Sequence, residues 1–415
     1  MHLNGVEFIY ADYRDLKNGL TTDIYFLRTK KILENEGLDN VEVNAEFTPS
    51  SFPKGYPWAV LGGLRDVAKL LEGLPVDVDA IPEGTVFFKE DYYGVKEPVI
   101  NIRGPYASFA IYETPILGFL AYGSGVATKA SRIKLLAGDA IVLSFGARRT
   151  HPAVSPFNAF YAYIGGCDGV SCVLGAEKFL GIKPTGTMPH SLMIIFKALR
   201  GDHTKAWEAF DKHMPPDVPR IILVDTFYDE KTEALIAAEK LGPKIYGIRL
   251  DTPSSRRGDL SKIVREIKWE LKLRGFDHIK IAVSGGIDED SIPLLKTAGV
   301  DAFGVGSAIA NARIIDIAMD ITAVKKDGRW IPITKRGKFS GIKTIYRCPS
   351  CFIDIVASTD KEAPACPKCG SKMQNLMKPV IRNGKIVMDF QTPEKEREYV
   401  LQQVRRLKLD KKPWE

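Results

Sequence analysis

Four of the six cysteines stand in two C-x-x-C pairs, Cys348-Pro-Ser-Cys351 and Cys366-Pro-Lys-Cys369, with fourteen residues between the pairs. Each pair can place two thiolates on one tight turn, and two such turns complete the tetrahedral four-sulfur shell that Zn²⁺ prefers in structural sites. The spacing predicts a zinc knuckle over about residues 344–377. Because four cysteines leave no open coordination position, we expect the metal to be structural.

Two disulfides are the alternative for these cysteines, and they require an oxidising compartment. The first fifteen residues carry acidic side chains and lack the apolar core of a secretion signal, so we expect a cytoplasmic protein. The longest uncharged stretch, residues 150–167, contains two prolines and two glycines, which argues against a membrane helix. Cys167 and Cys172 lack a second pair and are expected to be small core residues.

Polar residues follow several short apolar runs, at the points where the predicted strands end. Arg148 and Arg149 follow one run, Asp225 ends another, and Arg249 and Asp251 stand at the end of a third. In a parallel barrel such residues meet at one mouth, where barrels carry their chemistry. Three more polar residues belong to the same predicted set: Asp168, Ser171 and His190.

Two glycine-rich turns lead into predicted helices after the last two strands. Backbone N–H groups that no side chain covers bind anions at such turns, and barrels place phosphate in these two loops. Tight-turn packing is the alternative for one such turn, but two turns in this order predict a phosphate site. The residues concerned are Ser284, Gly285, Gly286, Gly304, Gly306 and Ser307.

A phosphate site beside several arginines suits a substrate with more than one anionic group. Asp225 and Asp251 can hold ribose hydroxyls or, through water, a Mg²⁺ ion that masks a diphosphate. Together these groups predict a site for a phosphoribosyl donor.

Other interpretations of single residues stay open. Helix N-capping is the alternative for Asp168 and Asp225, and rim salt bridges are the alternative for the arginines. His151 and His203 can be interpreted as exposed residues, with a functional role open for His151, and His213 is expected to be structural.

The elements that carry these residues alternate between short apolar runs and amphipathic segments. This alternation predicts a parallel sheet, and six or seven units over about 170 residues favour a barrel over a doubly wound sheet. The expected helices between strands cover 229–241, 259–275 and 289–299. The expected strands cover 140–145, 162–165, 220–225, 245–250, 278–284 and 302–305.

The chain is long enough for two or three domains, since domains usually have about 100–200 residues. Residues 41–102 have the short runs of a β-rich region, and residues 106–137 favour helices. We therefore expect an N-terminal β-rich domain with helices over 1–137, a catalytic α/β barrel over 138–322 and a C-terminal region over 323–415.

Composition and charge exclude several classes of protein. Hydrophobic residues make up 45% of the 415 residues, which excludes a disordered or fibrous chain. The net charge of +7 is modest for this length and favours an anionic ligand over a nucleic-acid duplex.

Several of these segments form motifs that resemble those of the nicotinate phosphoribosyltransferases, nearly from end to end of the chain. Quinolinate and nicotinamide phosphoribosyltransferases belong to the same type II group. The resemblance implies its fold, an irregular α/β barrel with a β-rich N-terminal domain, and the zinc knuckle indicates the archaeal-type branch. Seven motifs occur in the family's order: Thr22-Asp23-Ile24-Tyr25, Glu113-Thr114-Pro115, 127–132, Phe145-Gly146-Ala147-Arg148-Arg149, 165–171, 186–191 and Arg249-Leu250-Asp251-Thr252.

The resemblance also implies roles for single residues. Tyr25 is expected to stack on the pyridine ring in a neighbouring subunit's site, and Phe145 to form the other face of that sandwich. His190 is the expected active-site histidine that couples the reaction to ATP, with Asp225 and Asp251 as further catalytic residues. The expected substrate contacts come from Arg148, Arg149, Asp168, Ser171, Arg249 and Thr252.

The implied reaction joins nicotinate to 5-phosphoribosyl 1-pyrophosphate (PRPP) and yields nicotinate mononucleotide and pyrophosphate for NAD salvage. The implied cofactors are Mg²⁺ with PRPP and ATP as a co-substrate that phosphorylates His190, beside the structural Zn²⁺. A homo-oligomer is expected, because Tyr25 must reach another subunit's site.

Three alternatives remain from the sequence. Arg148-Arg149-Thr150-His151-Pro152 resembles the R-K-T-x-P segment of quinolinate phosphoribosyltransferase, which takes a dicarboxylate and releases CO₂. A nicotinamide phosphoribosyltransferase is the second alternative, since residues 168–171 do not separate acid from amide. The zinc knuckle with its basic tail allows an RNA-binding protein, but few aromatic residues interleave with the basic ones.

Overall fold

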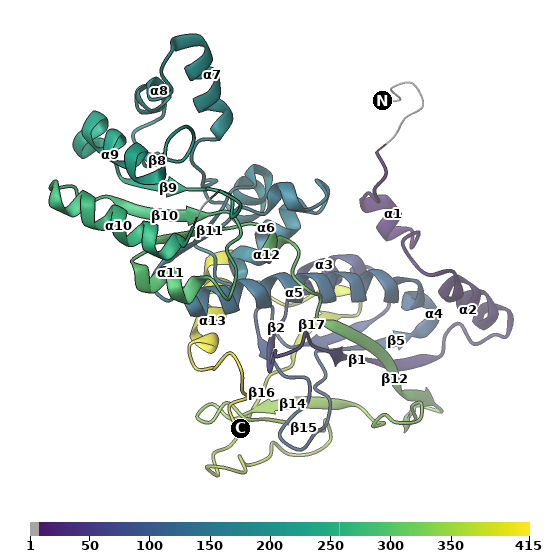
Figure 1. Cartoon of the computed structure of the whole chain (residues 1–415). Coiled ribbons are helices and arrows are strands. Elements are labelled where there is room, and N and C mark those ends of the chain that lie inside the picture. Colours follow the sequence, from purple (N-terminus) through teal and green to yellow (C-terminus); the bar gives the residue numbers. More distant parts are fainter. Residues whose placement is uncertain (1–7, 257) are drawn as a thin grey trace. The chain divides into compact units, whose positions relative to one another are not determined.

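The computed structural model describes residues 8–256 and 258–415, which form two compact units (Figure 1). One unit, called unit 1 here, combines Met1–Thr128 with Arg313–Glu415, and unit 2 is Lys129–Ala312. The two ends of the chain therefore share one unit. The expected division at residues 137 and 322 stays a prediction, and the contacts group its first and third parts together.

Unit 1 is built on an antiparallel sheet of seven strands in the order β13-β12-β1-β5-β3-β17-β18. Strand β1 lies inside this sheet, and seven successive residues in it, 43–49, are buried. The chain's C-terminal part adds strands on both sides of it, which is why the two ends fold as one unit. The strands are β1 Glu42–Ser51, β3 Asp77–Ala80, β5 Ile100–Pro105, β12 Asp316–Lys326, β13 Arg329–Pro332, β17 Lys378–Arg382 and β18 Lys385–Ile386.

Helices and a short ribbon complete the core of unit 1. Helix α3 buries five of its eight residues, in the i, i+3, i+4 pattern of an amphipathic helix, and its side chains join the same core as those of β1 and β5. The ribbon pairs β2 Ala59–Val60 with β4 Val86–Phe87. The helices are α1 Tyr13–Lys17, α2 Ile24–Asn35, α3 Leu64–Leu71, α4 Tyr106–Phe109, the first part of α5 Glu113–Ala137, and α13 Pro393–Val404.

A small three-stranded sheet in unit 1 carries the cysteines between its strands, β14 Lys343–Arg347, β15 Asp354–Ser358 and β16 Gln374–Asn375. Arg347 lies opposite Asp354 across β14 and β15, and both side chains are buried. Arg347 Nε donates to Asp354 Oδ1 at 2.7 Å, and Nη2 donates to Asp354 Oδ2 at 2.5 Å and to the carbonyl of Val86 at 2.7 Å. The ion pair therefore joins this small sheet to the β2–β4 ribbon.

Unit 2 contains a parallel sheet of six strands in the order β7-β6-β11-β10-β9-β8. The last strand of the chain in this sheet, β11, pairs with the first, β6, as in a barrel. Between β7 and β8, however, no strand pairing joins the described residues, so the barrel is open there. The strands are β6 Ile141–Ser144, β7 Gly169–Val170, β8 Ile221–Leu223, β9 Gly247–Leu250, β10 Lys280–Ser284 and β11 Ala302–Val305.

Helices follow the strands of unit 2 as the alternating pattern predicts. Helix α10 buries Val264, Ile267 and Leu271 on one face, and the side chain of Asp259 caps its N-terminus. The helices are the rest of α5, α6 Ser155–Ile164, a π-helix Gly175–Leu180, α7 His190–Arg200, α8 Lys205–His213, α9 Glu230–Leu241, α10 Leu260–Leu273, α11 Ile292–Ala298 and α12 Ser307–Ala310.

One predicted strand is wrong: residues 162–164 form the end of helix α6, Gly165 is its C-cap, and the strand β7 follows at Gly169–Val170. Helix α6 buries seven of its ten residues. A short apolar run from such a helix looks like a buried strand, because no polar face reveals the 3.6-residue period. The other five expected strands are confirmed as β6, β8, β9, β10 and β11.

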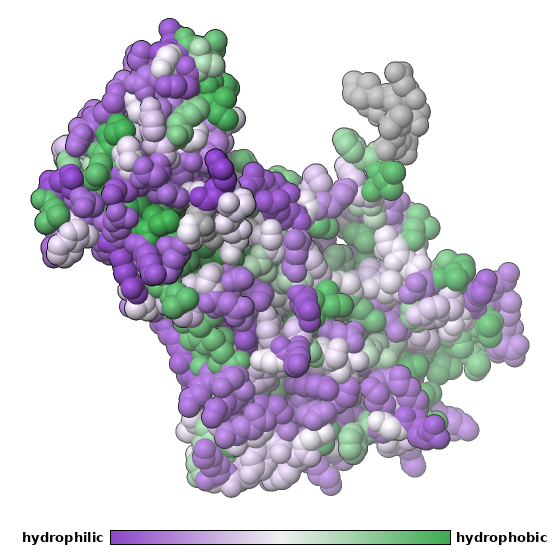
Figure 2. All heavy atoms as spheres, viewed as in Figure 1, coloured by the Kyte–Doolittle hydropathy of each residue, from purple (hydrophilic) through white to green (hydrophobic). Residues whose placement is uncertain are grey.

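The surface of the described residues shows where apolar side chains stay uncovered. Ile194, Ile195 and Leu199 on α7 are exposed, and green atoms gather over this helix in Figure 2. Among the described helices, none is long and apolar enough to cross a membrane.

Replacing Arg347 by Met is expected to destabilise unit 1 strongly. The substitution leaves the buried Asp354 carboxylate without its ion partner, and a broken buried pair typically costs about 3–5 kcal/mol of unfolding free energy. Chemical denaturation followed by fluorescence measures the loss.

Lys69→Met is the matched control in the same unit, because the Lys69–Glu72 pair is exposed and exposed pairs contribute little. Equal unfolding curves for R347M and K69M would show that the buried pair does not hold the small sheet.

Candidate functional site

A cavity of about 900 Å³ lies in unit 2, where the strands of its parallel sheet end. Phe145 follows β6, Ser284 ends β10, and Gly306 follows β11. The structure thus brings most of the predicted site residues to one place, as expected for the carboxyl ends of parallel strands. The predicted residues that line it are Phe145, Arg148, Arg149, Ser171, His190, Arg249, Asp251, Ser284, Gly285, Gly286, Gly304, Gly306 and Ser307.

Two glycines are required by close contacts in this cavity. Gly285 has φ +84°, and a Cβ atom there would lie 3.2 Å from Asp251 Oδ1. A Cβ atom on Gly304 would lie 2.6 Å from the ring of Phe145, so the ring rests directly on the backbone of β11. Gly285, Gly286, Gly304 and Gly306 all line the cavity, so both glycine-rich segments bring residues without side chains to its wall.

His190 and Asp225 form a hydrogen-bonded pair at the cavity wall. His190 begins α7, and its Nε2 lies 3.1 Å from Oδ1 of Asp225. The Asp225 side chain is 1% exposed, whereas that of His190 is 37% exposed. The hydrogen bond to Asp225 raises the pKa of His190 above its ordinary value, against the opposing effect of burial.

Asp225 is fixed on its other oxygen as well. Its Oδ2 accepts hydrogen bonds from the backbone N–H of Asp251 at 2.5 Å and from Oγ1 of Thr252 at 2.9 Å. Neither Asp225 nor Thr252 lines the cavity among the described residues. They support the cavity wall from behind, with His190 in front of them.

Three arginines bring positive charge to the cavity. Arg148 and Arg149 lie on the exposed turn after β6. Arg249 is largely buried, and its Nη2 donates to the carbonyl of Met188 at 3.0 Å. Burial is the main reason that the pKa of Arg249 is lowered, and the charge of Arg148 lowers it further. The charges of Asp251 and Asp225 act in the opposite direction and raise the pKa of Arg249.

Asp168 does not line the cavity. It precedes β7, and its Oδ2 accepts a hydrogen bond from the backbone N–H of Val142 and pairs with Lys134 Nζ, both at 2.8 Å. The prediction placed Asp168 after a strand at 162–165, but the observed strand β7 begins after Asp168. The aspartate therefore lies at the amino end of the sheet.

Tyr25 belongs to unit 1, where it lies on α2 and is exposed. It lines a second cavity of about 540 Å³ together with Phe26, Tyr106 and Glu113. Burial raises the pKa of Glu113 to about 7. The expected role of Tyr25 in a neighbouring subunit stays a prediction.

Some residues that line the cavity are not indicated by the sequence motifs. Asp288 and Asn311 line the cavity, and their only signal was proximity to the glycine-rich turns. The interpretation of His203 as exposed is wrong: His203 is buried beside Glu233, with its Nε2 3.1 Å from Glu233 Oε1. His151 is exposed, as that interpretation expected.

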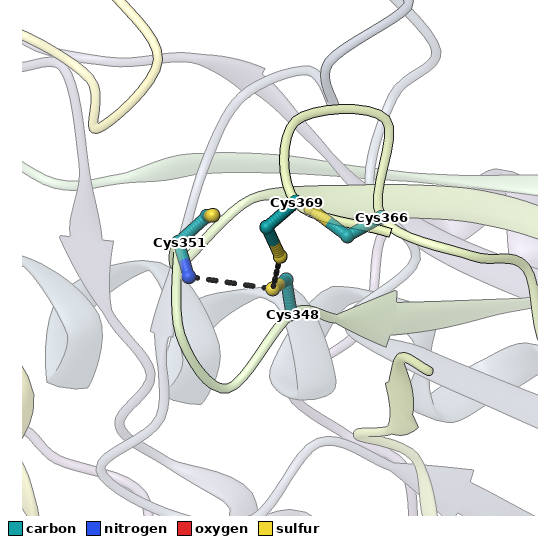
Figure 3. A group of neighbouring side chains, drawn as sticks. All are labelled: Cys348, Cys351, Cys366 and Cys369. Atoms are coloured by element: carbon teal, nitrogen blue, oxygen red, sulfur yellow. Dashed lines mark hydrogen bonds between the residues drawn. The ribbon is translucent and has the colours of Figure 1, made fainter. Parts of the chain in front are cut away.

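The four paired cysteines gather in unit 1, as Figure 3 shows. Their sulfur atoms all lie within 4.8 Å of one another. Cys348 Sγ and Cys369 Sγ are 3.6 Å apart, close to the edge of about 3.8 Å of a tetrahedron with Zn–S bonds of about 2.3 Å. The cluster therefore fits a metal ion. Cys167, outside the cluster, is buried as expected.

Comparisons with known proteins agree with this arrangement. Residues 23–124 match the family model for the quinolinate phosphoribosyl transferase N-terminal domain, and residues 126–320 match that for the C-terminal domain. Nicotinate phosphoribosyltransferase of Bacillus subtilis (strain 168) is 28% identical over 377 residues, which cover 81% of this chain and 74% of that protein.

Solved structures extend the likeness to the whole chain. The crystal structure of nicotinate-nucleotide pyrophosphorylase from Pyrococcus furiosus is 51% identical, with a TM-score of 0.90 over 97% of this chain and 100% of that one. Human nicotinic acid phosphoribosyltransferase is 21% identical, with a TM-score of 0.72 over 92% and 93% of the two chains, and shares the fold. This chain belongs to the family of the quinolinate phosphoribosyl transferase domains, with the type II phosphoribosyltransferase fold, and is similar to nicotinate phosphoribosyltransferases over most of its length.

Proposed function

We propose that this protein transfers the phosphoribosyl group of PRPP to nicotinate, and so makes nicotinate mononucleotide and pyrophosphate for NAD salvage. The observation that carries the proposal is one cavity that combines two glycine-rich turns, three arginines and His190, which Asp225 binds from behind the cavity wall. We place the reaction in the cytoplasm, where a reducing environment keeps the paired cysteines available for a metal.

The transfer requires positioning and charge stabilisation rather than a covalent enzyme intermediate. The bond from ribose C1 to pyrophosphate breaks while the pyridine nitrogen attacks, through a transition state with a cationic ribose. The backbone turns at Gly285 and Gly306 suit the 5′-phosphate, and Arg249 suits the departing pyrophosphate. The ring nitrogen of nicotinate is already a nucleophile, so the step needs no general base.

The charges in the cavity favour an acid over an amide. Phe145 supplies an aromatic face, and Arg148, Arg149 and Ser171 lie in the same cavity. Arginine binds carboxylate with paired hydrogen bonds, which a neutral amide cannot match. Quinolinate, with two carboxylates, is the second candidate, because the matching family models carry the name of its transferase.

A coupling of the reaction to ATP is supported by the geometry of His190. Its Nε2 is engaged by Asp225, so Nδ1 is the nitrogen left to attack the γ-phosphorus of ATP. That attack would form an N–P bond at Nδ1 and release ADP, and later loss of the phosphoryl group to water would drive mononucleotide formation. Asp225 would stabilise the imidazole in the tautomer with hydrogen on Nε2.

Mg²⁺ fits the cavity as a companion of PRPP. Asp251 and Asp288 are carboxylates in the cavity wall, and Mg²⁺ usually binds through one or two carboxylates plus substrate phosphates. Bound Mg²⁺ would neutralise the diphosphate. Zn²⁺ suits the four cysteines, where it would hold the turns of the small sheet together.

A homo-oligomer with shared active sites follows from the proposal for Tyr25. In unit 1, Ile24 and Tyr25 on α2 are exposed, and in unit 2 the apolar face of α7 is exposed. Exposed apolar faces of this kind usually mark contacts with another protein chain. We propose a second copy of this chain as that partner.

Mononucleotide formation from PRPP and Mg²⁺ is expected with nicotinate, and much less with nicotinamide or quinolinate. Arg149→Leu is expected to lower kcat/KM for nicotinate by about 10- to 100-fold, because a hydrogen bond to a charged group contributes about 1.5–3 kcal/mol. Chromatographic assay of the mononucleotide measures both results.

Arg265→Leu is the matched control, since Arg265 is an exposed arginine on α10 outside the cavity. If none of the three pyridines yields a mononucleotide, the proposed function fails. Faster release of CO₂ from quinolinate than turnover of nicotinate would replace it by the second candidate.

Phosphorylation of His190 by γ-labelled ATP is expected to increase as the pH rises through the pKa of His190. Only the neutral imidazole has a lone pair on Nδ1, and Asp225 raises this pKa, so the midpoint is expected above the ordinary histidine value. Asp225→Asn is expected to move the midpoint to lower pH. Equal labelling of wild type and His190→Ala would refute the coupling.

One Zn²⁺ per chain is expected on metal analysis of the purified protein. Cys351→Ser and Cys369→Ser are expected to lose the metal and to unfold at lower temperature, because metal binding contributes to folding. Cys172→Ser, outside the cluster, is expected to keep both. Chelation that stops turnover without lowering the melting temperature would contradict a structural role.

A further inference from the structure

The loop after β8 is held by a single buried carboxylate. The backbone N–H groups of Thr226, Phe227 and Tyr228 all donate to the side chain of Glu233, at 3.0, 2.8 and 3.1 Å. Thr226 binds Oε2, whereas the other two share Oε1. This loop follows Asp225 directly in the chain.

The position of Glu233 in the sequence explains how it reaches the loop. Asp229 caps α9 through the N–H of Thr232 at 3.0 Å, which places Glu233 in the first turn with its side chain directed back along the chain. Glu233 is fully buried. Burying a carboxylate is costly unless hydrogen bonds satisfy it, and three amide donors do so here.

A buried histidine, His203, lies on the other side of the Glu233 carboxylate. His203, in the turn before α8, places Nε2 at 3.1 Å from Oε1 of Glu233. Its ring packs against Trp207, Phe227 and Tyr228, with centroids 5.1–5.7 Å apart. The three amide groups of the loop therefore hold Glu233, and the buried His203 ring fills the space beside it without a hydrogen bond to it.

Asp225 lies directly before this loop in the chain, and its side chain is bound on both oxygens. Its Oδ1 faces His190 Nε2, and its Oδ2 accepts from Asp251 N and Thr252 Oγ1. Strand β8 ends at Leu223, so strand pairing does not hold the chain after Asp225 and the amide contacts to Glu233 do. We infer that Glu233 is a positioning residue that keeps Asp225, and through it His190, in place for the reaction.

The consequence for catalysis rests on the proposed function, but the effect on His190 does not. The groups that face His190 are Asp225, Asp251 and Arg249. If Glu233 acts through Asp225, loosening the loop weakens the contact that raises the pKa of His190. A residue that only stabilises the fold would lower the melting temperature and leave that pKa unchanged.

Glu233→Gln is the test, because the amide has nearly the same shape and one oxygen fewer to accept hydrogen bonds. NMR titration of histidine-labelled free protein is expected to show the pKa of His190 falling toward its value in Asp225→Asn. Turnover of nicotinate with ATP is expected to lose about 10- to 100-fold in kcat, as a misplacement of about 1 Å produces. The KM for nicotinate is expected to change little.

Two further variants make the result specific. Glu239→Gln, an exposed carboxylate on the same helix, is expected to leave the pKa and kcat unchanged. Glu233→Asp, which keeps the charge on a shorter side chain, is expected to shift the pKa less and in the same direction, and it serves if E233Q does not fold. In the double variant with Asp225→Asn, Glu233→Gln is expected to add no further shift.

The outcomes separate this inference from the proposed function. An unchanged His190 pKa in a folded Glu233 variant, or an added shift in the double variant, would overturn the inference. A falling pKa in a protein that makes no mononucleotide would support the positioning role while the proposed function fails.

Discussion

The burial of the Asp225 carboxylate behind His190 is the constraint on which the site depends. A carboxylate that is 1% exposed persists only if its oxygens are satisfied, and Asp251 N, Thr252 Oγ1 and His190 Nε2 satisfy them. These donors come from the turn after β9 and from the start of α7, which lie far apart in the sequence. The requirement to pair one carboxylate therefore joins the ends of two strands and the start of a helix into one wall.

The parallel sheet makes this convergence possible, and the gap between β7 and β8 is where His190 enters the cavity wall. The strands β9, β10, β11, β6 and β7 are successive neighbours in the sheet, and residues at or just after the carboxyl end of each of these five line the cavity. The described strands β7 and β8 do not pair, and the chain between them supplies α7 with His190. The histidine thus comes from the gap in the barrel, whereas the phosphate turns come from its closed side.

Sequence patterns predicted correctly those features whose cause lies in residues close together in the chain. The glycine-rich turns, the capped helix α10 and the cysteine pairs each have a short-range cause, and each lies where expected. Asp168 lies outside the cavity lining, because its predicted place depended on a strand at 162–165, whose apolar run fits a buried helix as well. The sequence did not indicate Glu233, because its partners are backbone N–H groups, which nearly every residue type has.

Unit 1 shows a different limit of sequence reasoning. The pairing of β12 with β1, and of β17 with β3, brings residues about 300 positions apart into one sheet. No local sequence pattern encodes that pairing, so the sequence did not indicate that the C-terminal region pairs with the N-terminal strands. The consequence is that the cysteine cluster belongs to the same unit as Tyr25. A metal that stabilises the small sheet therefore contributes to the stability of the unit that carries Tyr25, although it lies outside the cavity where we place the reaction.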